Sequence, residues 1–141
     1  MAVFLTSEGQ TAVYTGTNPD DANSWTLRGV FDVGEPLGQT PLFKLGGDIL
    51  ILTTYGLTPL TKLLKEGWTS SKTTLTDIIF AYFQSVVRGV EHSKEWCVTA
   101  HPKLNLLMIN VPGTASRGQQ QLAMNLVTGA WTTFTGWDTS C

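Results

Sequence analysis

"FLTSEGQTAVYTG" (residues 4–16) and "ILTTYGLTPLTKL" (residues 51–63) share one pattern at an offset of 47 residues. Each contains a run of β-forming residues, a glycine and a second run of the same kind. Glycine suits a tight corner between strands, because it adopts positive φ angles at little steric cost. We therefore predict two related β-hairpins with equivalent corners. The matched pairs are Leu5 and Leu52, Gly9 and Gly56, and Thr11 and Thr58.

Further runs of β-forming residues continue along the chain, separated by short stretches rich in Gly, Pro, Asn and Asp. The run "ILIL" at 49–52 does not alternate with polar residues, which indicates a strand covered on both faces. Trp131 and Phe134 are three positions apart and are expected on opposite faces of one strand. The strands that we predict cover about residues 2–7, 11–15, 25–33, 42–46, 49–55, 57–64, 95–100, 104–111, 119–127 and 130–137.

The segment at 73–89 has a different period. Its apolar residues recur at intervals of three and four, which is typical of one face of an α-helix. Thr74 is suited to cap the start, Asp77 to occupy the first turn, and Arg88 with Gly89 to end the helix. We expect this face to be buried against the sheets or a partner chain, with Ile78, Ile79, Tyr82 and Val86 as the buried residues.

Glycine corners at Gly9, Gly56 and Gly113 divide the chain into units of about 1–40, 41–94 and 95–141, and the helix at about 73–89 is an insertion in the second unit. Four-stranded units that repeat at about 40–50 residues are typical of β-propeller blades. The fold class that we predict is mostly β, with about three incomplete, propeller-like antiparallel four-stranded blades and one inserted amphipathic α-helix. The chain, residues 1–141, would be a single β-rich domain or fragment. An antiparallel sandwich is the alternative.

Propellers have about four to eight blades, so three incomplete blades would leave faces and edges uncovered. We expect the chain to be a portion of a longer protein, or to be completed by further copies of itself. A homo-oligomer is therefore expected. The predicted seams are the edge strands near 2–7 and 130–137, through Val3, Leu5, Trp131 and Phe134.

The composition excludes several classes of protein. Of 141 residues, 42% are apolar and 14% are charged, and the net charge is −2 without a cluster of Lys and Arg. This charge pattern lacks the usual footprint of a specific nucleic-acid binder. The longest apolar run, at 49–52, is too short to cross a bilayer. Two cysteines do not make a disulfide scaffold, and the expected compartment is the cytoplasm or a particle assembled there.

The chain offers few residues for site chemistry. His92, Cys97 and His101 could ligate zinc, but their spacing matches no common zinc motif and a fourth ligand is missing nearby. The oxygen-rich stretch "TNPDDAN" (17–23) lacks the Gly and distal Glu of a calcium loop and is better explained as a surface turn. "LGGD" (45–48) is expected to form a hairpin turn, since no phosphate-binding motif follows it.

The sequence shows no nucleophile–base pair, so we predict no catalytic, cofactor or metal site and no enzymatic activity. Aromatic side chains could stack on sugars, although tryptophan in a strand belongs more often to the core. The tryptophans are Trp25, Trp68, Trp96, Trp131 and Trp137.

Three stretches, at 3–38, 46–60 and 121–137, resemble bacteriophage and prophage virion proteins of the tail region. Similar proteins of short-tailed phages carry β-propeller-like domains in the tail hub or nozzle. The resemblance implies a structural component of the virion, assembled in the bacterial host cytoplasm, with other phage structural subunits as partners and possible contact with DNA in transit. No membrane contact is implied. The alternatives are a glycan- or receptor-binding β module of a phage tail and, last, an enzyme.

Overall fold

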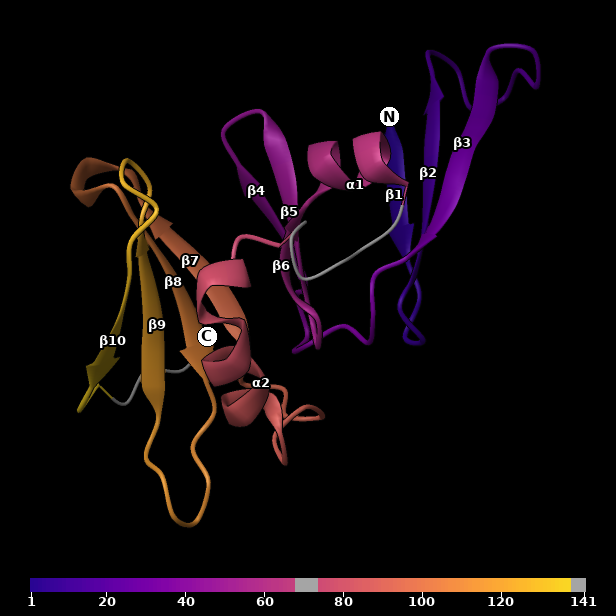
Figure 1. The fold of residues 1–141 in the computed structure, drawn as a ribbon. Helices are drawn as coiled ribbons and strands as arrows, with labels where there is room; N and C mark the ends of the chain where they lie inside the picture. The colour runs from indigo at the N-terminus through magenta and orange to yellow at the C-terminus, as the bar shows by residue number, and fades with distance from the viewer. Residues whose placement is uncertain (68–73, 138–141) are drawn as a thin grey trace.

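A computed structural model describes residues 1–67 and 74–137 of the chain, and in this part the strands form three antiparallel sheets (Figure 1). The strands follow chain order within every sheet, since each pairs with its neighbour in sequence. The first sheet contains β1 (Ala2–Leu5), β2 (Gln10–Gly16) and β3 (Trp25–Asp32). The second contains β4 (Leu42–Leu45), β5 (Asp48–Thr53) and β6 (Gly56–Pro59). The third contains β7 (Cys97–His101), β8 (Leu106–Val111), β9 (Gln120–Asn125) and β10 (Trp131–Thr135).

The prediction of a mostly β fold is confirmed, and each sheet takes its strands from one of the three predicted units. Among the described residues the sheets have three, three and four strands, so the first two units are incomplete, as predicted, and the third has four strands. The three sheets follow one another across the view of Figure 1 and do not close into a ring.

The second sheet lies between the other two and has apolar side chains on both of its faces. Leu50 and Leu52 of β5 join a core shared with the third sheet, whereas Ile51 of the same strand joins a core shared with the first sheet. All three side chains are at most 2% exposed. The prediction that residues 49–52 are covered on both faces is therefore confirmed.

The core between the first and second sheets is completed by α1 (Leu60–Glu66). The strand predicted for residues 57–64 is wrong from Leu60 onward, where α1 begins. Pro59 supplies an extended residue before the helix, and Gly67, at φ 76°, ends it by donating its N–H to the Leu63 carbonyl. Leu60 and Leu63 are buried, and this spacing of three is the helical signal that the sequence contained.

The larger core lies between the second and third sheets and includes α2 (Phe80–Val87), which is preceded by a 3-10 turn, η2 (Asp77–Ile79). Phe83, Val86 and Val87 of α2 are buried in this core, and Phe83 contacts Trp96 at a ring-centroid distance of 6.2 Å. The helix predicted at 73–89 is thus confirmed in part, because it is shorter than predicted. Residue 73 lies outside the described residues.

The predicted burial of this helix is wrong at two positions. Ile78 is 80% exposed and Tyr82 is 43% exposed, whereas Val86 is buried and Ile79 is half-buried. Tyr82 lies within α2, next to the buried Phe83, at the edge of the buried face. The entry through η2 explains the exposure of Ile78, since a 3-10 turn has about 3.0 residues per turn and changes the phase of the residues before α2. Thr74 therefore does not cap the helix, and the residue before η2 is Thr76.

The two glycine corners are similar but not equivalent. Leu5 pairs with Thr11 in the first sheet, whereas its counterpart Leu52 pairs with Leu57 and not with Thr58. The second hairpin is therefore tighter by one residue, and Gly56 is already part of β6. The predicted sequence repeat describes two hairpins of the same kind with different registers.

We expect Phe83→Ala to lower the free energy of unfolding by about 3–5 kcal/mol, because Phe83 is fully buried and its removal leaves a cavity in the larger core. Ile78→Ala is the matched control in the adjacent exposed turn and should change stability by less than about 0.5 kcal/mol. Urea denaturation of both variants measures the difference. Equal losses of unfolding free energy in the two variants would contradict the exposure of Ile78. They would support burial of the whole predicted helical face.

We expect Gly56→Ala to lower the free energy of unfolding by about 1–3 kcal/mol. Gly56 has φ 129°, and an added Cβ would lie 2.1 Å from Oγ1 of the buried Thr76. Gly47→Ala is the control, since a Cβ at this hairpin turn meets nothing within 4 Å. Thermal or urea unfolding of the two variants should separate them, and a neutral Gly56→Ala would show that the Gly56–Thr76 contact is not tight.

Candidate functional site

The first sheet has one face against the core and one face that nothing in the described chain covers. The strand pairing brings Phe4, Ala12 and Val30 into one row across the uncovered face. A second row contains Tyr14 and Leu27, which pair directly. We call this surface the outer face; its residues are Phe4, Ala12, Tyr14, Trp25, Leu27 and Val30.

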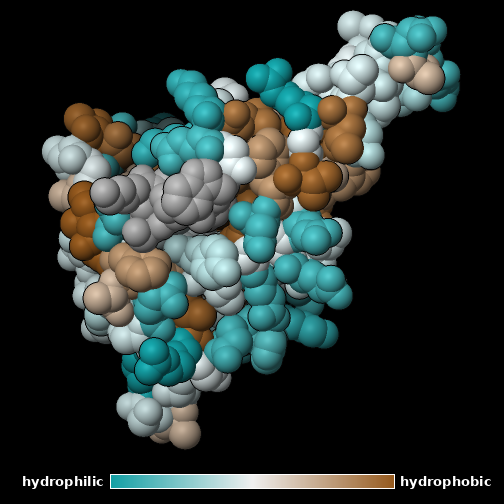
Figure 2. All heavy atoms as spheres, turned by 45° about the vertical axis from the view of Figure 1, so that its right-hand side comes forward, coloured by the Kyte–Doolittle hydropathy of each residue, from teal (hydrophilic) through white to brown (hydrophobic). Residues whose placement is uncertain are grey.

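The outer face is apolar and accessible. Phe4 is 58% exposed, Leu27 50% and Val30 56%. A hollow of about 460 Å³ lies between Phe4, Ala12, Tyr14 and Trp25. Figure 2 shows hydrophobic side chains gathered beside the base of the hairpin formed by β2 and β3, whose polar tip projects at the upper right. A sheet face of this composition would normally be buried.

Three aromatic rings form a continuous row on this face. The rings of Phe4 and Tyr14 meet edge to face with centroids 5.8 Å apart, and those of Tyr14 and Trp25 stack at 6.0 Å with an interplanar angle of 8°. Both arrangements are favourable for aromatic pairs. The row therefore gives the outer face a rigid, ordered surface.

A β-bulge in β3 determines which side chains reach the outer face. Val13 pairs with Gly29 but the next residue, Tyr14, pairs with Leu27, so Arg28 is an extra residue in β3. Leu27 and Val30 are three apart and would lie on opposite faces of a regular strand. The bulge places Leu27 and Val30 together on the outer face. Their spacing in the sequence does not predict this.

The four residues predicted to form contacts between chains differ in which face of their sheet they occupy. β1 and β10 are edge strands of their sheets among the described residues, as predicted. The side chains of Val3 and Leu5 pack against the core between the first and second sheets and do not face outward, so a seam at β1 stays a prediction for the strand edge. Side chains alternate along a strand, and it is Phe4 that points outward. Trp131 and Phe134 lie on opposite faces of β10, since they are opposite Met124 and Gln121.

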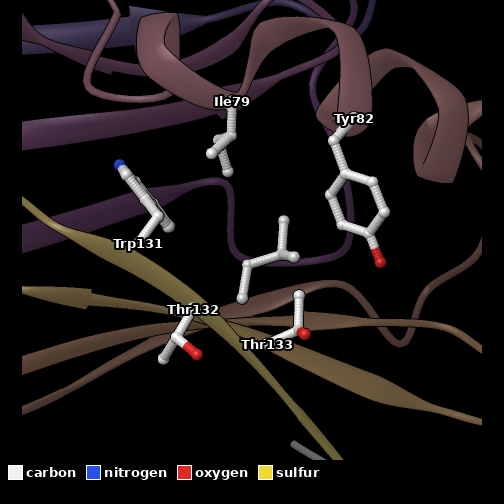
Figure 3. A pocket seen from close by; sticks show the side chains of 6 residues that line it. Ile79, Tyr82, Trp131, Thr132 and Thr133 are labelled. Atoms are coloured by element: carbon white, nitrogen blue, oxygen red, sulfur yellow. The ribbon is translucent and has the colours of Figure 1, made fainter.

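A second hollow is a cleft of about 360 Å³ between α2 and β10 (Figure 3). Ile79 and Tyr82 reach into it from the helical segment, while Trp131 and Thr133 approach from β10; Thr132 borders the cleft with its backbone side, and its side chain points away from the helix. The buried Leu122 of β9 also lines the cleft. The walls are thus two aromatic rings and aliphatic groups, with one hydroxyl group on the strand side, that of Thr133.

Hydrogen bonds hold both aromatic walls of the cleft. The Trp131 Nε1–H donates to the Leu75 carbonyl at 3.1 Å, and the Tyr82 hydroxyl donates to Gln120 Oε1 at 3.2 Å. Gln120 is only 5% exposed, and its Nε2 has no hydrogen-bond partner in the described part of the chain. A buried amide nitrogen without a partner is costly. Gln120 is not among the residues that line the cleft, and its Nε2 is buried while the cleft is empty, so it lies behind the cleft wall.

The three candidate zinc residues have different surroundings. His92 is exposed and its Nδ1 lies 3.1 Å from Glu35 Oε1, whereas Cys97 is buried at the start of β7. His101 is exposed at the other end of β7. Within residues 1–67 and 74–137, no group of three or more His, Cys, Asp or Glu side chains is arranged to hold a metal ion.

The oxygen-rich stretch after β2 forms a turn stabilised by its own side chains. Asn18 Oδ1 accepts the Asp20 N–H at 3.1 Å, and Asp21 Oδ1 accepts the Asn23 N–H at 2.9 Å. These are local side-chain to backbone bonds of the kind that Asn and Asp make in turns. They explain the composition of the stretch as turn chemistry.

The tryptophans have different environments. Trp96 is a core residue, 1% exposed, while Trp25 and Trp131 are half-buried at the outer face and the cleft. Trp137 is 54% exposed. Trp68, also considered as a sugar-stacking residue, lies outside the described residues.

Comparison with known proteins identifies no relative: no family model matches the chain, and no curated protein or solved structure matches it significantly. None of the helices in the described ranges is long and apolar enough to cross a membrane.

Proposed function

We propose that the chain is a non-enzymatic structural subunit of a bacteriophage tail, which packs against further subunits through the outer face of its first sheet. The observation that carries the proposal is the exposure of Phe4, Leu27 and Val30 together on this face. The partners would be copies of this chain and other structural subunits of the virion.

The internal arrangement of the sheets supports this type of packing. Each face of the second sheet is buried against a neighbouring sheet, through Ile51 on one side and Leu50 on the other. The outer face is the surface of the first sheet that points away from the second sheet, so it is the next sheet face in this stack. A further sheet placed on it would extend a stack of propeller-like blades, in which every blade face is covered by the next.

The chemistry of the outer face favours a protein partner over a sugar. Ala12, Leu27 and Val30 are aliphatic, and the residues around the hollow contribute one hydroxyl group, that of Tyr14. A sugar needs hydrogen-bonding groups beside the aromatic rings, whereas aliphatic and aromatic side chains together are typical of the buried centre of a protein interface. Catalysis receives no support here, because no carboxylate or histidine lines the hollow.

The phage-tail part of the proposal comes from the resemblance of residues 3–38, 46–60 and 121–137 to tail-region virion proteins. The charge pattern is compatible with this role. A weakly acidic chain, with net charge −2, would not hold DNA that passes along it, because retention requires phosphate contacts from Lys and Arg.

We expect the purified chain to self-associate at micromolar concentration, and the double variant Leu27→Lys/Val30→Lys to be monomeric, since two ammonium groups on the outer face would be buried without partners. Sedimentation equilibrium measures the change. Val127→Lys is the control, because Val127 is 75% exposed in the turn before β10. A wild-type monomer, or an equal effect of Val127→Lys, would contradict subunit packing through the outer face.

We expect peptides of the chain to be present in purified phage particles from the host that encodes it, at the same ratio to tail proteins in every preparation. Mass spectrometry of density-purified virions and of the remaining lysate tests this. Peptides found only in the lysate would contradict a virion role, even if the purified chain self-associates.

A further inference from the structure

We propose that the outer face is covered by the outer face of a second copy of the chain, in a twofold dimer in which β3 of each copy lies over β1 of the other. The inference rests on the proposed role of the outer face in subunit packing, and it names the partner and the geometry. Identical faces that cover each other form a closed pair, whereas different faces would form an open-ended stack.

Within the described ranges, the opposite end of the three-sheet stack is partly covered by the chain itself. Side chains alternate along β9, so Gln121 points away from the larger core. Its Nε2 donates to the Trp137 carbonyl at 3.1 Å, and the Trp137 ring packs on Phe134 with centroids 5.4 Å apart. The exposed Thr99 and Thr132 lie on the edge strands of this face. The two ends of the stack therefore differ, and the end that stays open and apolar is the outer face.

The composition of the outer face suits a second copy. Its six residues are uncharged, so two outer faces bring no like charges together and bury no ion. A partner with a charged surface would lose hydration there without gaining an ion pair. The second copy supplies an uncharged, apolar surface, and its Phe4, Leu27 and Val30 are exposed for the same contact.

The outer face also has a protruding part and a receiving part. On β3, at the edge of the sheet, Leu27 and Val30 project into solvent and are 50% and 56% exposed. The hollow of about 460 Å³ is lined by Phe4 of β1, by Ala12 and Tyr14 of β2 and by Trp25, and not by Leu27 or Val30. The hollow can therefore receive an aliphatic side chain that the same chain does not place in it.

A twofold axis along the central strand, β2, brings these two parts together. Rotation by half a turn about this axis carries β3 of one copy over β1 of the other and preserves the position along the strands. Val30 shares its cross-strand row with Phe4 and Ala12, so it meets these two residues of the second copy. The two sheets then stack in the aligned manner, about 10 Å apart, that covers sheet faces in β-sandwiches.

Isotope-filtered NMR on an equal mixture of labelled and unlabelled chains tests this geometry, because the filter retains signals between copies alone. We expect contacts between the methyl groups of Leu27 and Val30 of one copy and the rings of Phe4 and Tyr14 of the other. Sedimentation equilibrium at rising concentration should approach the mass of a dimer and of no larger species.

Ala12→Leu is the diagnostic variant. Ala12 lies on β2 under the proposed axis, so the two added side chains would meet each other, fill both hollows and hold the sheets apart. We expect dimerisation to weaken about tenfold, although the face becomes more apolar. Val127→Leu, at a 75% exposed turn position, should leave dimerisation unchanged. Circular dichroism shows whether both variants are folded.

Other results would overturn the inference in distinguishable ways. Species larger than a dimer, with contacts from the outer face to Thr132 or Phe134 of another copy, would overturn the closed pair and leave packing through the outer face intact. A monomer at every concentration, or a dimer without contacts at the outer face, would contradict both proposals. Dimerisation of Ala12→Leu that equals or exceeds that of the wild type would overturn the twofold geometry.

Discussion

The burial of β5 on both faces is the constraint on which the rest of the structure depends. Ile51 and Leu52 are adjacent in sequence, fully buried, and belong to the two different cores. A strand of this kind requires apolar cover on each side, which the first sheet with α1 and the third sheet with α2 provide. The order of the three sheets, and the exposure of the outer face at one end, follow from this requirement.

The strands could be predicted because their sequence signals are local. The helices were harder to predict, because their limits depend on the helical phase of the apolar residues and on contacts with distant residues. The apolar residues of η2 and α2 matched one helical face, yet the 3-10 turn rotated Ile78 into solvent. α1 is not predicted because it begins directly after β6, with no turn residues between the strand and the helix. Its start is stabilised by a remote group, since Asp48 Oδ1 accepts the Thr61 N–H at 3.2 Å, and no sequence window contains that contact.

Neither candidate surface could be derived from sequence spacing. The outer face depends on the bulge at Arg28, which changes the side of the sheet on which Leu27 lies relative to Val30. The cleft combines Tyr82 with Trp131, which are separated by 49 positions and approach each other only through the packing of α2 on the third sheet. Trp131 was noted as aromatic, but its anchor at Leu75 is visible only in three dimensions.

The chemistry of the two surfaces implies different kinds of contact. The outer face exposes Phe4, Leu27 and Val30 to water, so a stable cover lowers its free energy and favours a lasting contact. The cleft carries the hydroxyl groups of Tyr82 and Thr133, which water can satisfy while the cleft is empty, so it does not require a permanent cover. The two surfaces share no side chain, because the outer face belongs to the first sheet, whereas the cleft is formed by η2, α2 and the third sheet.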